Sequence, residues 1–406
     1  MPLHVTLPAS VVVTDASELM RPRLDGPGVH RAKGEVLWLE GGHVRYAGPE
    51  SGLPIEARTA PRQSAGGRAV LPAFVDAHTH IVFGGDRVAD FDRRSRGLSY
   101  AEIAAEGGGI VTTVRATRET STAQLTARTR GFLEQRRQAG VLTTEIKSGY
   151  GLDADTELRM LEAVAVLRAE GWDVEGTLLA AHTVPPDRPR EAWVQEIVQE
   201  LIPEVARRGW ARFVDVFVER SAYRPDEARA IFEAALAHGL IPRIHADQLS
   251  AGGGAELAAK LGAASADHLE HISEEGIRAL AESGTVAGLL PGALVHLGDS
   301  APGLGRRLVD AGVEVAVATD ANPGSSPTHN LALVATLAVT RMGLTTEEAL
   351  RAVTLGAARS LRRPELGHLE PGARARLVVL DHADARAWVA AFGEPTVAEV
   401  WVQPLA

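Results

Sequence analysis

Four histidines and one aspartate stand out in this sequence because together they could hold a metal ion. Two of the histidines form the pair His78-Thr79-His80, and His245 and His268 each come at the end of a short apolar run. Asp320 ends a further run of this kind, Val-Ala-Val-Ala-Thr-Asp. Three imidazoles and a carboxylate are a ligand set that suits a catalytic zinc or iron ion. The sequence therefore indicates a metal-dependent enzyme.

Taken singly, these residues have ordinary structural explanations. A lone His-x-His pair is weak evidence of a metal, and His245 could be a core histidine bonded to a backbone carbonyl. Asp320 could cap a helix or form an Asx turn before Asn-Pro-Gly. Their placement at matching positions of one predicted fold is what favours the metal site.

That fold is predicted from the alternation of apolar and amphipathic segments after Leu71. Short apolar runs alternate with stretches of helical periodicity, which is typical of βαβ units and a parallel sheet. The runs of strand length are eight in number, at 71–77, 142–148, 174–181, 212–218, 240–246, 264–269, 284–289 and 313–319. Eight parallel strands with helices between them predict a (β/α)8, TIM-like barrel over residues 66–364.

In such a barrel the catalytic groups lie at the C-terminal ends of the strands. The histidine pair closes the first predicted strand, His245 ends the fifth, His268 the sixth and Asp320 the eighth. Side chains two apart on a strand point to one face, so Asp76, His78 and His80 should share a face and both imidazoles could reach one ion.

The two ends of the chain have a different pattern, that of short strands broken by Gly, Pro and charge. Residues 36–40 (Val-Leu-Trp-Leu-Glu) are followed by Gly-Gly and a second strand-like run, and 375–381 and 397–402 resume the pattern near the C-terminus. We therefore predict a small discontinuous β-sandwich domain built from residues 1–65 and 365–406. The alternative is that these segments are separate edge decorations of the barrel.

Composition excludes several classes of function. Acidic residues outnumber basic ones by 52 to 42, for a formal charge of −10, so no electrostatic footprint for nucleic acid is present. The absence of cysteine excludes disulfides and thiolate ligands, and favours hydrolytic over redox chemistry. Without a run of eighteen apolar residues or a signal-peptide pattern, we expect a cytoplasmic protein that does not bind membranes.

The predicted ligand set also suggests a mechanism. An ion with an open position lowers the pKa of its bound water towards neutrality, which supplies a nucleophile for an amide-like carbon. Asp320 could contact the metal, take the water proton and return it to a leaving nitrogen. We expect His268 to polarise the carbonyl or stabilise the oxyanion rather than to bind the metal.

One ion is expected rather than two. The fourth predicted strand ends in Val216-Phe217-Val218-Glu219, with no lysine that could be carboxylated to bridge a second ion. Lys147 ends the second strand, which is the wrong strand for that role. Its alternatives are a structural ion pair near the barrel mouth and a contact to substrate.

At these residues the sequence resembles the amidohydrolase superfamily, over nearly its whole length. The first and last of the matching segments are shared across the superfamily, whereas the Gly-Gly-Gly-Ile and Lys-Ser-Gly-Tyr-Gly segments resemble a branch that acts on imidazolone rings. The segments are Asp76-Ala-His-Thr-His80, Phe83-Gly-Gly-Asp-Arg87, Gly107-Gly-Gly-Ile-Val-Thr-Thr-Val-Arg-Ala-Thr117, Glu145-Ile-Lys-Ser-Gly-Tyr-Gly-Leu-Asp153, His245-Ala-Asp-Gln248, Ser265-Ala-Asp-His268 and Ala318-Thr-Asp-Ala-Asn-Pro-Gly-Ser-Ser326.

This resemblance implies a reaction, the hydrolytic opening of the ring amide of 4-imidazolone-5-propanoate to N-formimidoyl-L-glutamate in histidine degradation. It assigns metal ligation to His78, His80, His245 and Asp320. It also implies a set of substrate contacts, which are Arg87, Tyr150, His182, Gln248, Asn322, Gly324 and Ser325.

The implied substrate fits several of these residues. A propanoate tail calls for a guanidinium, and Arg87 lies just beyond the first strand, where a bidentate pair could form. The turn at 322–326 offers backbone N–H groups and hydroxyls as a carboxylate site. The alternatives are a surface pair of Arg87 with Asp86 or Asp90, a packing role for Tyr150, and a capped strand end at His182.

Two segments bear on details of the mechanism. Residue 248 is Gln, which cannot act as a base, where relatives can carry Glu. The proton path would therefore depend on Asp320, while Gln248 orients substrate or water. The run Gly107–Gly109 lacks the spacing of a phosphate loop, and we expect it to belong to a lid over the substrate.

Two rival functions stay open on the sequence alone. One is another mononuclear amidohydrolase, such as a deaminase or hydrolase of nucleobases or cyclic ureas, which would have no propanoate for Arg87 to bind. The other is a barrel without catalysis, which the intact ligand set disfavours. The donor set suits Zn2+ and Fe3+ alike, and we predict one Zn2+ per subunit. By resemblance we also expect a homodimer.

Overall fold

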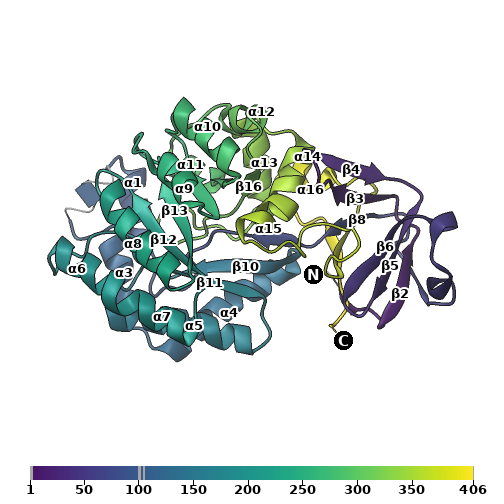
Figure 1. Cartoon of the computed structure of the whole chain (residues 1–406), viewed down its shortest axis with the longest axis horizontal. Coiled ribbons are helices and arrows are strands. Elements are labelled where there is room, and N and C mark those ends of the chain that lie inside the picture. Colours follow the sequence, from purple (N-terminus) through teal and green to yellow (C-terminus); the bar gives the residue numbers. More distant parts are fainter. Residues whose placement is uncertain (1–2, 99–101, 104–105, 406) are drawn as a thin grey trace.

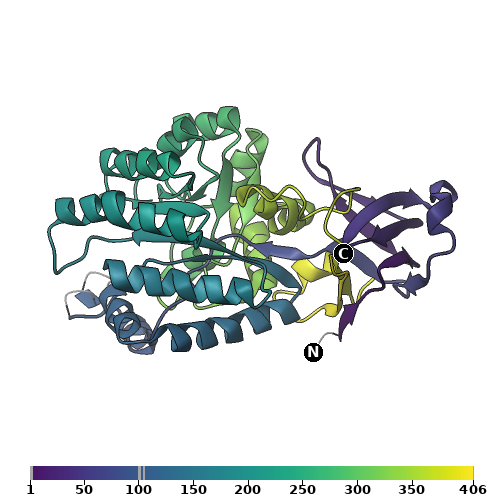
Figure 2. The same cartoon turned by 60° about the horizontal axis from the view of Figure 1, so that its bottom comes forward.

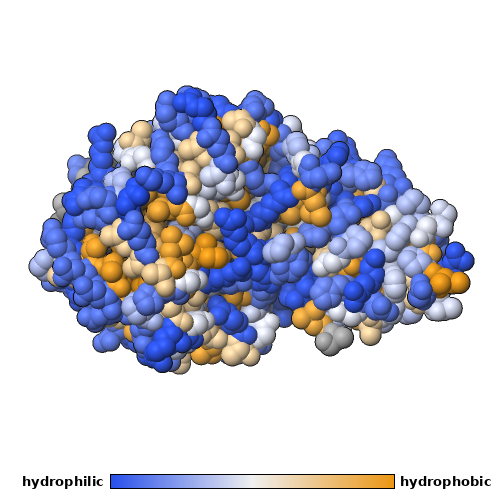
Figure 3. Space-filling model, in the orientation of Figure 1, coloured by the Kyte–Doolittle hydropathy of each residue, from blue (hydrophilic) through white to orange (hydrophobic). Residues whose placement is uncertain are grey.

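The computed structural model describes residues 3–98, 102–103 and 106–405. Figures 1 and 2 show two bodies side by side, a barrel surrounded by helices and a smaller body of β-strands that holds both chain ends. The space-filling view is mainly hydrophilic, and its larger apolar patches lie over the barrel (Figure 3). None of the described helices is long and apolar enough to cross a membrane.

The barrel consists of eight parallel strands that pair in the order in which they occur in the chain, which confirms the predicted (β/α)8 fold. The strands are β9 (Phe74–Asp76), β10 (Val141–Lys147), β11 (Val174–Ala181), β12 (Phe213–Val218), β13 (Ile241–Ala246), β14 (Ser265–His268), β15 (Val286–Leu289) and β16 (Val315–Val317).

Helices follow the strands and cover the outside of the barrel (Figures 1 and 2). Two of them continue through short π-helical turns, at Ile197–Leu201 and Ala352–Gly356. The helices are α1 (Val88–Ser95), α3 (Ile110–Arg118), α4 (Thr122–Gln138), α5 (Ala154–Ala169), α6 (Arg190–Glu196), α7 (Ile202–Arg208), α8 (Pro225–Ala237), α9 (Gly254–Leu261), α10 (Glu274–Ser283), α11 (Pro291–Leu297), α12 (Leu304–Asp310), α13 (Leu331–Met342), α14 (Thr346–Arg351) and α15 (Ala357–Ser360).

The first and last barrel strands meet through the segments that follow them. Thr79 and Ala321 form a parallel bridge, in which His80 N donates to Ala321 O and Asp320 N donates to His78 O. The seam that closes the barrel therefore runs through the predicted ligands, so the backbone of one ligand segment positions the other.

The smaller body contains a six-stranded and a four-stranded sheet. The larger sheet combines strands from both ends of the chain: β1 (Leu3–Thr6), β18 (Val397–Val402), β17 (Arg376–Leu380), β8 (Ala69–Pro72), β3 (Glu18–Pro22) and β4 (Val29–Ala32). The other contains β6 (His43–Pro49), β5 (Glu35–Glu40), β2 (Ser10–Thr14) and β7 (Arg62–Ser64). A short helix, α16 (Ala387–Ala390), lies between β17 and β18.

The run predicted as one strand over 71–77 is two strands in different sheets. Ala73 N donates to Arg376 O of β17, and the next residue, Phe74, donates to Gly140 O beside β10. The chain thus passes from the sheet of the smaller body into the barrel sheet between Ala73 and Phe74. Because an apolar run looks the same in either sheet, sequence periodicity could not reveal this transfer.

Charged side chains, as well as apolar ones, fill the inside of the barrel. Glu145, Lys147, Asp215, Arg243 and Asp267 all lie on barrel strands and are buried. Lys147 Nζ lies 2.9 Å from Glu145 Oε1 and 2.8 Å from Asp215 Oδ2, which makes Lys147 part of a structural ion pair. Buried charges persist in a fold only when they are paired, and here each cation has carboxylate partners.

An ion-pair cluster around Asp173 joins the barrel to the small domain. Its carboxylate accepts hydrogen bonds from Arg363 Nη1 (3.0 Å), from Arg376 Nη1 of β17 (2.5 Å) and from Thr143 Oγ1 (2.8 Å). Burial acts to raise the pKa of Asp173, but the two guanidinium groups outweigh it and hold the pKa below its ordinary value.

We expect Asp173→Asn to lower the free energy of unfolding at neutral pH by about 1.5–3 kcal/mol, because it removes charge-assisted hydrogen bonds. Since folding lowers this pKa, the stabilisation is fully present above the unfolded value of about 4 and is lost as the pH falls through the folded pKa. Denaturant titrations of both proteins between pH 7 and about pH 3 measure the difference. The loss of stability caused by Asp173→Asn should be larger at pH 7 than at pH 3. An equal loss at both pH values, or a loss no larger than that caused by the exposed control Asp310→Asn, would contradict the prediction.

Candidate active site

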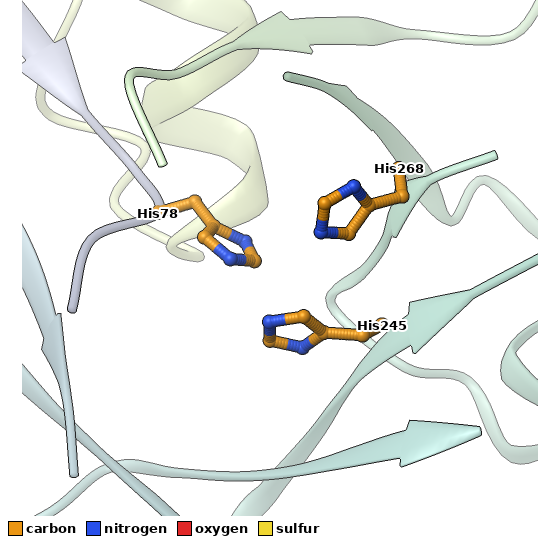
Figure 4. A group of neighbouring side chains, drawn as sticks. All are labelled: His78, His245 and His268. Atoms are coloured by element: carbon orange, nitrogen blue, oxygen red, sulfur yellow. The ribbon is translucent and has the colours of Figure 1, made fainter. Parts of the chain in front are cut away.

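The predicted ligands meet at the C-terminal mouth of the barrel. His78 and His80 follow β9, His245 lies in β13, His268 ends β14, and Asp320 follows β16. All five side chains are buried. Figure 4 shows the rings of His78, His245 and His268 pointing toward one another from three separate segments.

The ligand atoms have the spacing of a metal coordination shell. His80 Nε2 lies 3.2 Å from His78 Nε2 and 3.3 Å from His245 Nε2. Asp320 Oδ1 lies 3.3 Å from His80 Nε2 and 3.6 Å from His78 Nε2. Around an ion at about 2.0–2.1 Å, ligands at the corners of a tetrahedron are about 3.3–3.4 Å apart. The residues present therefore fit one metal ion.

His268 lies next to this group, beside His78 and His245. Its ring lies with those of His78 and His245 in a second set of three whose ligand atoms are within 4.8 Å of one another. Burial acts to lower the pKa of His268, but the adjacent Glu270 carboxylate, whose Oε1 is 3.6 Å from Nδ1, raises it above its ordinary value. A raised pKa favours hydrogen-bond donation to an oxyanion over metal ligation.

Two buried carboxylates orient the imidazoles. Asp267 Oδ2 lies 2.7 Å from His78 Nδ1, and Asp215 Oδ1 lies 2.9 Å from His245 Nδ1. Each carboxylate keeps the proton on Nδ1, so the Nε2 lone pair points to the common centre. Each carboxylate is in turn paired with a buried cation. Arg243 Nη2 donates to Asp267 Oδ2 at 3.1 Å, and Lys147 Nζ lies 2.8 Å from Asp215 Oδ2.

The pKa values agree with neutral histidine ligands and a buried carboxylate. Burial, followed by the charges of Lys147 and the other histidines, holds the pKa of His78 and His80 well below the ordinary value. Burial also raises the pKa of Asp320, since a charged carboxylate is costly in an apolar setting without a cation. A cation at the centre of the group would remove that cost.

Several residues at the mouth of the barrel have a backbone conformation that is rare for residues other than glycine. Asp247, His268, Leu269 and Asp320 all have positive φ, between 50° and 82°, although none of them is glycine. Such conformations cost about 1–3 kcal/mol each and persist where the surrounding structure imposes them, often at functional sites.

A cavity of about 100 Å³ opens beside the histidines. Every residue predicted to touch substrate lines it: Arg87, Tyr150, His182, Gln248, Asn322, Gly324 and Ser325. His80, His245, His268 and Asp320 line the same cavity. Ile110, the first residue of α3 after the Gly107–Gly109 run, also lies in its wall.

Arg87 lies at the edge of this cavity in an orientation that Asp90 helps to set. Arg87 Nε donates to Asp90 Oδ2, as in the surface-pair alternative, but Asp90 also accepts from Gly109 N at 2.9 Å. The far end of the guanidinium lies against Gly324, where an added Cβ would be 3.2 Å from Arg87 Nη1. The ion pair uses Nε and leaves Nη1 beside Gly324 in the cavity wall.

The turn after Asp320 differs from the predicted anion site. Gly324 N and Ser325 N both donate to the side-chain oxygen of Asn322, at 2.8 and 2.7 Å. These N–H groups are thus satisfied within an Asx turn and do not face a ligand. Asn322 Nδ2 donates to Ser325 Oγ at 2.8 Å, so the hydroxyl of Ser325 keeps its own proton for a ligand.

Asp76 does not join the metal group, contrary to the expectation that it shares a face with both histidines. Its carboxylate accepts from Thr319 N (3.0 Å), from Thr319 Oγ1 (2.6 Å) and from Arg136 Nη2 (3.2 Å). The strand ends at Asp76, so the alternation of faces does not extend to His78 and His80.

The supporting carboxylates Asp215 and Asp267 were missed by sequence reasoning. A usable signal existed, because an aspartate inside an otherwise apolar strand, as in Phe-Val-Asp-Val-Phe-Val, must have a buried partner. Which histidine each aspartate would meet depends on how the strands are arranged in the barrel. Asp215 of β12 meets His245 of the neighbouring β13, whereas Asp267 of β14 reaches across the barrel to His78.

We expect Asp267→Asn to weaken metal binding about 10- to 100-fold, because an amide oxygen is a weaker acceptor and holds the His78 tautomer less firmly. Competition with a chromogenic chelator measures the affinity of the purified protein. The exposed Asp299→Asn serves as the control, and equal affinities of the two variants would refute the supporting role of Asp267.

Comparison with known proteins shows the family of this chain. The Amidohydrolase family model matches residues 69–403. The chain is 44% identical over 402 residues to the imidazolonepropionase of Deinococcus radiodurans, which covers 97% of this chain and 98% of the relative. It is 47% identical over 357 residues to the imidazolonepropionase of Anaeromyxobacter dehalogenans, and the match covers 85% of this chain and 84% of the relative.

Solved structures of more distant proteins share the fold. A triazine hydrolase variant superposes with a TM-score of 0.74 at 17% identity, covering 98% of this chain and 95% of that one. Guanine deaminase from C. acetobutylicum superposes with a TM-score of 0.68 at 13% identity, and the match covers 97% of this chain and 98% of that one. With these relatives and this site, the chain belongs to the imidazolonepropionase family of the amidohydrolases.

Proposed function

We propose that this protein hydrolyses the ring amide of 4-imidazolone-5-propanoate to N-formimidoyl-L-glutamate, a step of histidine degradation. The observation that carries the proposal is the cavity lined by His80, His245 and Asp320 of the metal-type group, with Arg87 at its edge and His78 directly behind His80. The imidazolonepropionase family to which the chain belongs supports the same substrate.

We assign one Zn2+ ion per subunit to the three histidines and Asp320. A bound zinc ion would lower the pKa of water and so supply the nucleophile. A single ion is favoured because Phe217, and no lysine, faces the cavity from β12, while Lys147 is held by Glu145 and Asp215.

The protein's own side chains would carry the remaining steps. Arg87 binds the propanoate and fixes the ring in the cavity, with Tyr150 and His182 along its side. Asp320 takes the proton from the attacking water and delivers it to the ring nitrogen as the C–N bond breaks. His268, whose pKa the Glu270 carboxylate raises, donates a hydrogen bond to the oxygen that becomes negative. Gln248 orients substrate or water but does not take the proton.

Elemental analysis together with an assay of imidazolone propanoate absorbance tests the proposal. About one zinc per chain with turnover of this substrate supports it. One metal per chain without turnover would overturn the substrate and direct attention to cyclic ureas and nucleobases. Iron in place of zinc would change only the metal assignment. Sedimentation of the same preparation tests our expectation of a homodimer.

A further inference from the structure

A second cavity, of about 370 Å³, adjoins the active site on the far side of Arg87. The two cavities share Arg87 and Gly324 in their walls. We call the second cavity the arginine chamber and define it by Phe83, Arg87, Phe91, Arg94, Arg128 and His296, which line it. Nothing in the proposed reaction uses the residues of this chamber other than Arg87.

Two arginines of the chamber differ from their neighbours in having no carboxylate within ion-pair distance among the described residues. On α4, Arg130 pairs with Glu170, Arg136 with Asp76 and Arg137 with Glu134. Arg128 of the same helix has no ion pair among the described residues; its guanidinium lies over the ring of Phe83, 4.4 Å from the centroid.

Arg94 shows the same contrast on α1. Its neighbour Arg93 pairs with Asp90, whereas Arg94 Nη2 donates to His296 Nε2 at 2.6 Å and has no carboxylate partner in the described part of the chain. Burial and the nearby Arg94 lower the pKa of His296, so this ring accepts the hydrogen bond without offsetting the charge of Arg94. The nearest carboxylate influence on Arg94 comes from Asp90, which is not within ion-pair distance of it.

The carboxylates in the chamber wall are already engaged. Asp90 binds Arg87 and Arg93. Asp86 accepts a hydrogen bond from Val88 N at 3.0 Å and attracts Arg128 from beyond ion-pair distance, so the three arginines of the wall face two carboxylates. The other walls are apolar, since Phe83, Phe91, Pro323 and Pro327 line them. Cationic groups set in apolar walls concentrate the electric field and raise the local concentration of anions.

Such a field matters for this protein because the whole chain has a formal charge of −10. An anionic substrate would be repelled from most of the surface. We propose that the arginine chamber is an entrance that collects the carboxylate of the substrate and passes it to Arg87, with Arg94 and Arg128 as the collecting groups. The inference rests on the proposed function for the identity of the anion.

The test measures binding of a ligand that cannot react. 3-(Imidazol-4-yl)propanoate has the ring and the propanoate but no ring amide, so calorimetry on the zinc-loaded protein gives its Kd without turnover. At about 10 mM ionic strength, where the Debye length is roughly 30 Å, we expect Arg128→Gln and Arg94→Gln each to weaken binding about 3- to 10-fold. At about 1 M, where it is roughly 3 Å, the loss should vanish.

Arg130→Gln is the matched control, because it removes the same charge from the same helix at a site that is paired with Glu170 and does not line the chamber. Its loss of affinity at low ionic strength should be clearly smaller than that of Arg128→Gln, and its Kd should equal that of the wild type at high ionic strength. If Arg128→Gln and Arg94→Gln behave like this control, or if their loss persists unchanged in high salt, the entrance role is overturned. Thermal unfolding of each variant shows that the fold is retained.

Kinetics separate this inference from the proposed function. In the imidazolone assay, kcat/KM of Arg128→Gln should fall by the same factor as the affinity, with kcat within about twofold of the wild type. Wild-type turnover with no effect of either chamber variant would overturn the entrance alone. Salt-dependent binding that the variants weaken, without any wild-type hydrolysis, would overturn the proposed reaction and support the entrance.

Discussion

Asp320→Asn is expected to lower kcat/KM by about 10³-fold or more, because it affects both metal binding and proton transfer. Asparagine has nearly the same shape but cannot accept the proton of the attacking water, and its amide oxygen is a weaker ligand than a carboxylate. Asp320 Oδ1 is within 3.3 Å of His80 Nε2, so both roles fall on one side chain. Steady-state kinetics and metal content of the purified variant measure the two losses separately.

The folded state should tolerate this substitution. Burial raises the pKa of Asp320, which means that its charge opposes folding of the metal-free chain, and a neutral asparagine removes that cost. Melting of the metal-free variant should therefore occur at or above the wild-type temperature. A variant that retains a tenth of wild-type kcat/KM with full metal content would contradict the assignment of Asp320 as the proton carrier.

Arg87→Ala is expected to lower kcat/KM by a factor of about 30 to several thousand, mainly through KM. Removing one partner of a desolvated, hydrogen-bonded charge pair costs about 2–5 kcal/mol. The Arg87 side chain is largely buried and Asp90 fixes its Nε, so its terminal nitrogens meet the carboxylate with little loss of freedom. Initial rates over a wide range of imidazolone propanoate give KM and kcat independently.

Two further measurements separate substrate binding from a structural role of Arg87. Arg87→Lys keeps the charge without the planar fork and should recover only part of the lost affinity. The propanamide counterpart of the substrate has no carboxylate, so wild type and Arg87→Ala should process it equally. If Arg87→Ala lowered kcat for both substrates by one common factor, the residue would support the fold of the mouth rather than hold the carboxylate.

Much of this architecture was readable from the sequence, for definite physical reasons. Parallel strands are buried on both faces and leave apolar runs, and helices between them leave a 3.6-residue period, so the barrel followed from spacing alone. Catalytic groups must lie at the C-terminal ends of barrel strands, so the positions of the four histidines and Asp320 were meaningful before any coordinates.

The contacts across the barrel were not readable in this way. Asp267 meets His78 and Asp215 meets His245 across sequence separations of 189 and 30 residues, and only closure of the sheet decides such pairs. Likewise the N–H groups of Gly324 and Ser325 were expected to face a ligand, yet the nearby Asn322 side chain takes them first.

The sequence by itself thus determined the barrel, the type of ligand at each strand end and the family, because these depend on local periodicity and residue type. Only the tertiary structure decided that the chain changes sheets between Ala73 and Phe74, that carboxylates set the tautomers, and that Arg94 and Arg128 share a cavity with Arg87. Those features depend on which distant segments become neighbours, and a linear pattern of hydrophobicity does not encode the partner of a polar group.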